Sequence, residues 1–207
     1  MRKEDQEWIN ERYSTRIKEE NYSYEALRTG PWERRELRFD VLAGLGIETG
    51  SKVLDLGCGY GDLSDYFERK GIEIDYTGYD INPDFIEFAK QKYPDKKFEI
   101  CDIINQEFPQ FDYIVSSTCF NLKLKHQDNY EFVKQLLNSM HKHANKGLAI
   151  DFMTSYVDFE RDIMFHYEPE KVFSIAKGIT NRVTLRHDYP LFEFCIYMYP
   201  KFEGWAK

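Results

Sequence analysis

Residues 53–62, with the sequence VLDLGCGYGD, constrain the fold more than any other part of the chain. A short apolar run leads into Gly57, Gly59 and Gly61, and an amphipathic stretch follows. Because glycine has no Cβ, such a backbone can turn tightly and approach a ligand closely. The pattern predicts a strand, a glycine turn and a helix, with a ligand against the turn.

Short apolar runs and amphipathic stretches alternate after residue 46. Parallel strands need a crossover of about a dozen residues, which is usually a helix, so the alternation predicts a parallel sheet covered on both faces. The predicted strands of this part are residues 52–56, 74–79, 98–101, 111–116 and 147–152.

The two ends of the chain have different patterns. Residues 1–46 carry apolar residues at helical spacing and predict an N-terminal helical cap. Residues 182–186 and 192–199 are strand-like and predict a closing hairpin with an antiparallel last strand. The predicted fold class is therefore α/β: a doubly wound, mostly parallel seven-stranded sheet with helices on both faces. We expect residues 47–207 to form the ligand-binding domain, in one structural unit with the N-terminal cap.

Composition excludes several classes of partner. The net charge of −8 and the pI of about 5.2 predict repulsion from nucleic acid and from anionic lipid. No stretch approaches the roughly 20 apolar residues of a membrane helix, and the N-terminus resembles no export signal. Four scattered cysteines are typical of reduced thiols, so we expect a cytoplasmic protein.

Two local clusters of charged or metal-ligating side chains receive structural interpretations. The arginines at positions 34, 35 and 38 fit a solvated helix face with interspersed glutamates. His141 and His143 stand two residues apart on a predicted helix, where they point to different faces and cannot share a metal. We expect both histidines at the surface and no metal site.

The glycine spacing separates two cofactor classes. A dinucleotide site uses Gly-x-Gly-x-x-Gly, whereas the third glycine here comes one residue earlier. Asp55 would also repel bound phosphates but would favour a cationic amino group. An NAD-type oxidoreductase is thus the weaker alternative.

The segment resembles the first motif of the class I methyltransferases that use S-adenosylmethionine (SAM), and the resemblance extends over residues 37–153. It implies that Asp80 binds the ribose hydroxyls, that Asp102 meets the adenine amino group, and that Ser117 flanks the methionine end. The cofactor-binding residues implied are Asp55, Gly57, Cys58, Gly59, Gly61, Asp80, Ile81, Asp102, Ile103 and Ser117.

Methyl transfer needs a base only when the acceptor must lose a proton. His187 is the first candidate, with Asp188 as its orienting partner, because the turn of the final hairpin follows a strand that should end at the carboxyl edge of the sheet. An exposed polar turn is the alternative. His166 is the second candidate. Candidate substrate-binding residues are Asn121, Trp32, Tyr24 and Tyr189.

These patterns predict an enzyme that transfers a methyl group from SAM to an oxygen or nitrogen of a small molecule, such as a sugar or an amine. We expect a monomer or a homodimer. A protein that binds SAM without transferring its methyl group remains the other alternative.

Overall fold

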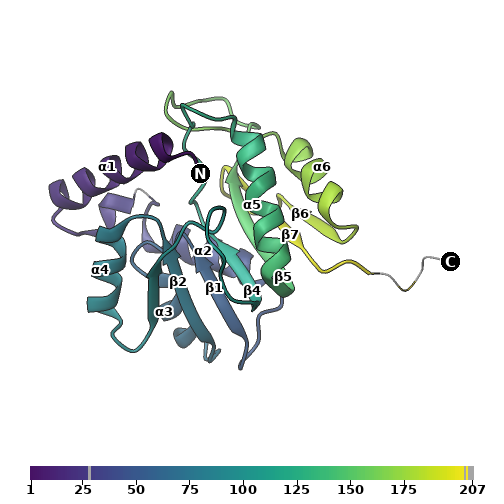
Figure 1. The fold of residues 1–207 in the computed structure, drawn as a ribbon, viewed down its shortest axis with the longest axis horizontal. Helices are drawn as coiled ribbons and strands as arrows, with labels where there is room; N and C mark the ends of the chain where they lie inside the picture. The colour runs from purple at the N-terminus through teal and green to yellow at the C-terminus, as the bar shows by residue number, and fades with distance from the viewer. Residues whose placement is uncertain (28, 203, 205–207) are drawn as a thin grey trace.

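The computed structural model describes residues 1–27, 29–202 and 204, and its centre is a seven-stranded sheet (Figure 1). The strands follow the order β3-β2-β1-β4-β5-β7-β6 across the sheet. They are β1 (Lys52–Leu56), β2 (Asp75–Asp80), β3 (Lys97–Ile100), β4 (Phe111–Ser116), β5 (Ala144–Met153), β6 (Val183–Arg186) and β7 (Glu193–Met198).

Strand directions match the expected α/β architecture. The neighbours β3, β2, β1, β4 and β5 pair in parallel, whereas β7 is antiparallel to both β5 and β6. The prediction of a mostly parallel sheet with an antiparallel last strand is confirmed. The order also places β7 between β5 and β6, so β6 forms an outer edge of the sheet.

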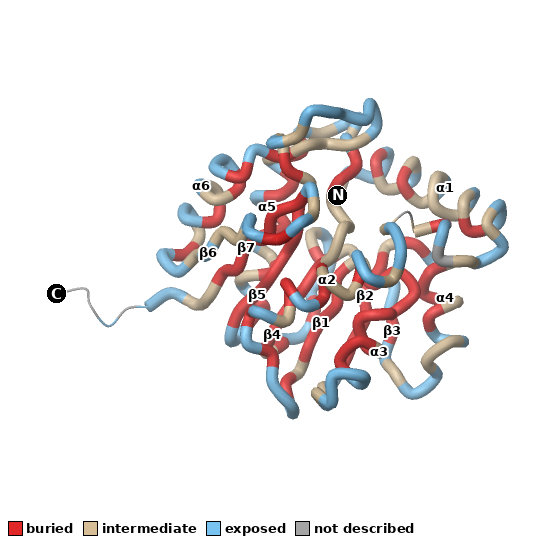
Figure 2. The backbone as a smooth tube through the Cα atoms, turned by 180° about the vertical axis from the view of Figure 1, so that it is seen from behind, coloured by how far each residue is buried: buried red, intermediate tan, exposed pale blue. Residues whose placement is uncertain are grey.

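Helices cover both faces of the sheet, as predicted. Side chains of α2 (Trp32–Ala43), α3 (Asp62–Arg69) and α4 (Pro83–Lys92) share one apolar cluster with the strands. Side chains of α5 (Asn129–His143) and α6 (Pro169–Ile179) share the cluster on the opposite face. The central strands β1, β2, β4, β5 and β7 are largely buried, as the red tube in Figure 2 shows, whereas the outer strands β3 and β6 are mostly exposed or half-buried.

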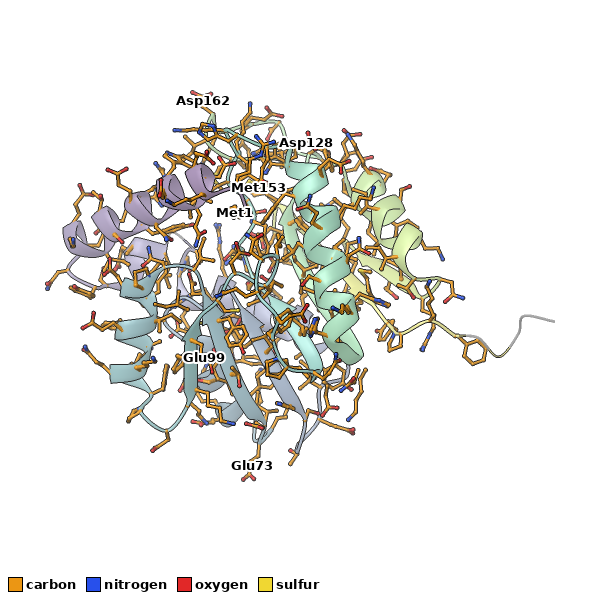
Figure 3. The ribbon with its side chains drawn as sticks, in the orientation of Figure 1. Met1, Glu73, Glu99, Asp128, Met153 and Asp162 are labelled. Atoms are coloured by element: carbon orange, nitrogen blue, oxygen red, sulfur yellow. The ribbon has the colours of Figure 1, made fainter. Side chains whose placement is uncertain are left out.

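The N-terminal cap lies across the carboxyl ends of the parallel strands with the part that precedes α2. It starts with α1 (Lys3–Glu19), continues through a short 3-10 turn (Tyr24–Leu27) and ends in α2. The Asn10 side chain donates a hydrogen bond to the carbonyl oxygen of Ile81, just beyond β2, at 3.1 Å. Figure 3 shows Met1 and Met153 toward this edge, with Glu73 at the opposite end of the sheet.

Two local interpretations were wrong. Arg35 and Arg38 are each only 7% exposed, because each pairs with a buried acid, Asp62 and Glu193 respectively, whereas Arg34 on the same helix is exposed. His143 is 6% exposed and stacks on Phe108 with ring centroids 3.9 Å apart. None of the described helices has the length and apolar character needed to cross a membrane.

Candidate functional site

A cavity opens at the carboxyl edge, between the parallel strands and the N-terminal cap. Its volume is about 860 Å³, including the part open to solvent, and lies within the range of small-molecule and cofactor sites. Seven of the predicted cofactor-binding residues line it, namely Gly57, Gly59, Asp80, Ile81, Asp102, Ile103 and Ser117. The cap contributes Ile9, Tyr13, Leu27 and Thr29.

The glycine turn after β1 needs all three of its glycines. Gly57, Gly59 and Gly61 have φ angles of +72°, +53° and +78°, in the left-handed region that side chains disfavour. A Cβ on Gly57 would lie 2.2 Å from the Sγ atom of Cys119, which follows β4. The turn therefore depends both on backbone freedom and on close packing.

Asp80 ends β2 and reaches the turn from the neighbouring strand. Its carboxylate accepts hydrogen bonds from the backbone N–H of Gly59 at 3.0 Å and of Asn82 at 2.9 Å. Burial raises the pKa of Asp80 to about 6, although these backbone hydrogen bonds oppose the shift. The Asp80 carboxylate lines the cavity and retains lone pairs for a ligand hydroxyl.

A second, smaller chamber adjoins the first. It encloses about 450 Å³ and shares its wall residues Leu27, Thr29, Gly57, Gly59, Ser117 and Thr118 with the larger chamber. Asp55 lines this chamber and accepts a hydrogen bond from the Tyr76 hydroxyl at 2.8 Å. Burial raises the pKa of Asp55 to about 7. Cys58 and Arg38 also line this chamber.

Asp102 and Ile103 follow β3 on the far side of the larger cavity. One Asp102 oxygen accepts from the backbone N–H of Ile104 at 3.0 Å, and the other lies 3.1 Å from the Met1 amino nitrogen. Ile103 is buried and contributes an apolar wall. An acid beside an apolar wall can recognise the edge and the face of a flat ring.

The segment after β4 forms the wall that both chambers share. Thr118 has a φ of +54°, which is unusual for a β-branched residue. Asp151 on β5 accepts hydrogen bonds from the Thr118 backbone N–H at 2.6 Å and from the Ser117 hydroxyl at 3.0 Å. Asn121 lies beyond this wall and accepts from the backbone N–H of Met153 at 2.8 Å.

His187 and Asp188 lie apart from the cavity lining. Both side chains are exposed, and Asp188 accepts a hydrogen bond from the Arg186 guanidinium at 2.8 Å instead of orienting His187. The His187 ring lies near Tyr156, with centroids 6.1 Å apart. The hairpin turn reaches the expected edge, but the position of β6 at the outer edge of the sheet separates it from β1, β2 and β4.

The second candidate base and the other candidate substrate-binding residues lie in different parts of the structure. His166 Nδ1 lies 2.9 Å from the Thr154 carbonyl oxygen, just beyond β5. Tyr189 is buried beside Asp151, which helps to raise its hydroxyl pKa after the larger effect of burial. The Arg35 and Arg69 guanidinium groups lie over the Trp32 ring, 4.9 and 4.2 Å from its centroid, and Trp32 faces a groove outside the two chambers. The side chain of Tyr24 lies outside the described residues.

Sequence reasoning missed the charged residues behind the shared wall. Arg38 donates two hydrogen bonds of 2.7 Å to the Glu193 carboxylate and a third of 2.6 Å to the Thr29 carbonyl oxygen. Asp151, buried beside Glu193, stands in the middle of an apolar strand. A carboxylate inside such a run was the available signal, because buried charges need partners.

Thr29 provides a further sign of ligand binding. Its hydroxyl oxygen is buried, lines both chambers, and has no hydrogen-bond partner within the described chain. Together with the glycine cradle and the Asp80 carboxylate, it fits a ligand that carries hydroxyl and amino groups. This sheet, with its ligand site at the carboxyl edge beside a glycine turn, defines a cofactor-binding α/β enzyme of the Rossmann-like class.

Comparison with known proteins identifies the family. A family model described as a methyltransferase domain matches residues 53–154. A putative methyltransferase of Mycobacterium tuberculosis is 33% identical over 152 residues, which cover 70% of this chain and 90% of the relative. The chain belongs to the SAM-dependent class I methyltransferases, and SAM is its cofactor.

Solved structures share the fold at low sequence identity. Magnesium protoporphyrin IX methyltransferase from Synechocystis with bound SAH, the demethylated cofactor, superposes with a TM-score of 0.69 at 14% identity, over 95% of this chain and 100% of that one. An amino pentose methyltransferase from Micromonospora echinaspora, solved with SAM, gives a TM-score of 0.62 at 12% identity, over 84% and 95% of the two chains.

Proposed function

We propose that this methyltransferase acts on an oxygen or nitrogen of a small-molecule acceptor held beneath the N-terminal cap. The observation that carries the proposal is the enclosure of the cavity by Ile9, Tyr13, Leu27 and Thr29 above the glycine turn. An enclosed site suits a small acceptor, because methyl transfer requires alignment of the reactants and exclusion of water.

Cofactor roles follow from the two chambers. We assign one side of the larger chamber to the adenosine part, with Asp80 toward the ribose and Asp102 with Ile103 toward the adenine, and the side beneath the cap to the acceptor. We assign the smaller chamber to the methionine part, where the Asp55 carboxylate favours the amino group. When bound, SAM supplies the electrophilic methyl group, and the protein holds the acceptor in line with it.

Neither His166 nor His187 lines the two chambers, and we propose His166 as the better candidate base because of the state of its ring nitrogens. Its Nδ1 atom must carry the proton if it is to donate to the Thr154 carbonyl, which leaves the Nε2 lone pair available. That Nε2 atom is buried and without a hydrogen-bond partner in the described part of the chain. We propose that it receives the acceptor proton when the acceptor carries one. His187 keeps the role of an alternative base at the outer edge.

The nature of the acceptor can be found by a screen. The protein, SAM and a panel of sugars, amino sugars, amines and carboxylic acids would be incubated, and SAH release measured. Two fold neighbours are named for small acceptors, a magnesium porphyrin and an amino pentose, and both compounds belong in the panel. SAM binding without turnover on any of these compounds would contradict the proposed acceptor class.

With an acceptor in hand, His166→Ala and His187→Ala form a matched pair. We expect His166→Ala to lower kcat by about 100-fold or more while leaving SAM affinity nearly intact, as loss of a general base does. His187→Ala should remain close to wild type. The reverse ranking would move the base to the final hairpin.

A further inference from the structure

A buried group of charged residues connects the cap to the wall between the two chambers. Arg38 on α2 pairs with Glu193 at the start of β7, and Asp151 on β5 lies beside Glu193. The register pairs Met153 with Glu193, so both acids stand near the carboxyl end of β5. Two acids accompany one guanidinium, and each of the three residues is at most 7% exposed.

This group contacts the site at two points. On the cap side, Arg38 donates to the carbonyl oxygen of Thr29, which lines both chambers. On the strand side, Asp151 holds Ser117 and Thr118, which also line both chambers. The network therefore fixes opposite walls of the same space.

Thr118 shows why the strand-side contact matters. A β-branched residue in the left-handed region is strained and persists only where its surroundings enforce it. The short hydrogen bond from its backbone N–H to a buried carboxylate is the contact that enforces it here. If this contact is lost, the backbone should relax toward a common conformation and carry Ser117 away from its place in the wall.

We propose that Asp151 is a positioning residue for methyl transfer, because it holds the Ser117–Thr118 wall against which the cofactor and the acceptor meet. The inference rests on the proposed function, since the wall affects catalysis only if both molecules bind there. Asp151 itself acts through Thr118 and Ser117 and need not touch either molecule.

Titration of Asp151 provides a spectroscopic test. Burial and the nearby Glu193 raise the pKa of Asp151 to about 7, while Arg38 and the hydrogen bonds from Thr118 and Ser117 lower it. Tyr189, Cys195 and Cys119 are the other titratable groups that interact with Asp151, and the pKa of each is raised well above neutrality. The Thr118 amide proton should therefore report a step near neutral pH that belongs to its carboxylate partner.

The first experiment follows the Thr118 amide by NMR in the cofactor-free protein from about pH 5 to about pH 9. We expect the step to disappear in Asp151→Asn. In Glu193→Gln we expect it at lower pH, because the neighbouring negative charge is gone. A step that survives Asp151→Asn overturns the proposal. If that variant does not fold, an unchanged midpoint in Glu193→Gln overturns it instead.

The second experiment measures SAM affinity by calorimetry at one pH. We expect Asp151→Asn to bind SAM about tenfold more weakly, as expected for the loss of a charge-assisted hydrogen bond. Asp112→Asn is the matched control. Asp112 also accepts a hydrogen bond from a backbone N–H, that of Lys52 at 3.0 Å, but it lies at the amino end of β4, away from the site. Its affinity should stay within about twofold of wild type.

The outcomes distinguish failure of the positioning role of Asp151 from failure of the proposed acceptor class. Equal SAM affinity in Asp151→Asn and wild type overturns the positioning role and leaves the methyltransferase assignment intact. Turnover of none of the screened acceptors, with SAM bound normally, contradicts the proposed acceptor class. The NMR result on the Thr118 amide does not depend on that class.

Discussion

Replacing Gly57 by alanine tests the packing of the glycine turn. The new Cβ would lie 2.2 Å from the Cys119 Sγ atom and 2.7 Å from its Cβ, at a φ of +72°. A left-handed backbone costs a non-glycine residue about 1–2 kcal/mol, and overpacking a core costs about 1–3 kcal/mol. We therefore expect Gly57→Ala to lower the free energy of unfolding by about 2–5 kcal/mol.

Gly71 provides a matched control. Its φ of +70° is nearly the same, but a Cβ there would meet no atom within 4 Å. Gly71→Ala should cost only the backbone part, about 1–2 kcal/mol. Urea denaturation of both variants, with m-values compared, measures the difference. Losses that agree within about 0.5 kcal/mol would refute the packing argument.

A double variant separates the two costs at Gly57. Changing Cys119 to glycine removes both the Sγ and the Cβ that the new methyl group would meet, and the nearest remaining atom, the Cys119 Cα, would be 3.9 Å away. Gly57→Ala should therefore cost about 1–3 kcal/mol less in a Cys119→Gly background than in wild type. An unchanged cost would mean that backbone strain accounts for the whole effect.

Three further predictions test the charged residues of the site. Asp80→Ala should weaken SAM binding by about 2–4 kcal/mol in calorimetry, because two charge-assisted hydrogen bonds to the ribose are lost; a loss too small to measure would remove that role. Burial raises the pKa of Asp55 from 3.8 to about 7, so wild type loses stability as pH rises from about 4 to about 7 and levels off above that. Asp55→Asn should then exceed wild type in unfolding free energy by up to about 4 kcal/mol at about pH 9 but not at about pH 3, and a difference independent of pH would contradict this. Arg38→Leu should lower the free energy of unfolding by about 3–5 kcal/mol, because it leaves the buried Glu193 unpaired. The double variant Arg38→Leu/Glu193→Leu should lose less, and equal thermal destabilisation of the two variants would argue against a buried ion pair.

Local patterns were sufficient for the sheet and for the cofactor edge. The 53–62 segment predicted a strand, a glycine turn and a helix, and the structure adds that all three glycines of the turn are left-handed. Asp80 and Asp102 follow neighbouring parallel strands, and such strand ends meet at one edge of a sheet. Their position at the carboxyl ends of parallel strands was readable from the sequence, and the pairing of β2 with β3 brings them to the same cavity.

Local patterns could not decide which charges are buried. The spacing of Arg35 and Arg38 among glutamates is that of a solvated helix face, yet the partner of Arg38 is Glu193, 155 residues further along the chain. The same holds for Asp151, which stands in an apolar strand and to which local patterns assigned no role. The role proposed for it depends on Thr118, whose positive φ no sequence pattern indicated.

The final hairpin also shows what the sequence determined and what only the tertiary structure decided. From the sequence alone, His187 was expected at the carboxyl edge, and the turn does follow a strand that runs in that direction. Only the tertiary structure decided that β7 inserts between β5 and β6, which moves His187 to the outer edge and leaves His166 beside β5. Periodicity along the chain determined the elements and the edge at which they bind a cofactor. The lateral order of strands and the long-range pairing of buried charges depend on contacts between distant residues, so only the folded chain decided them.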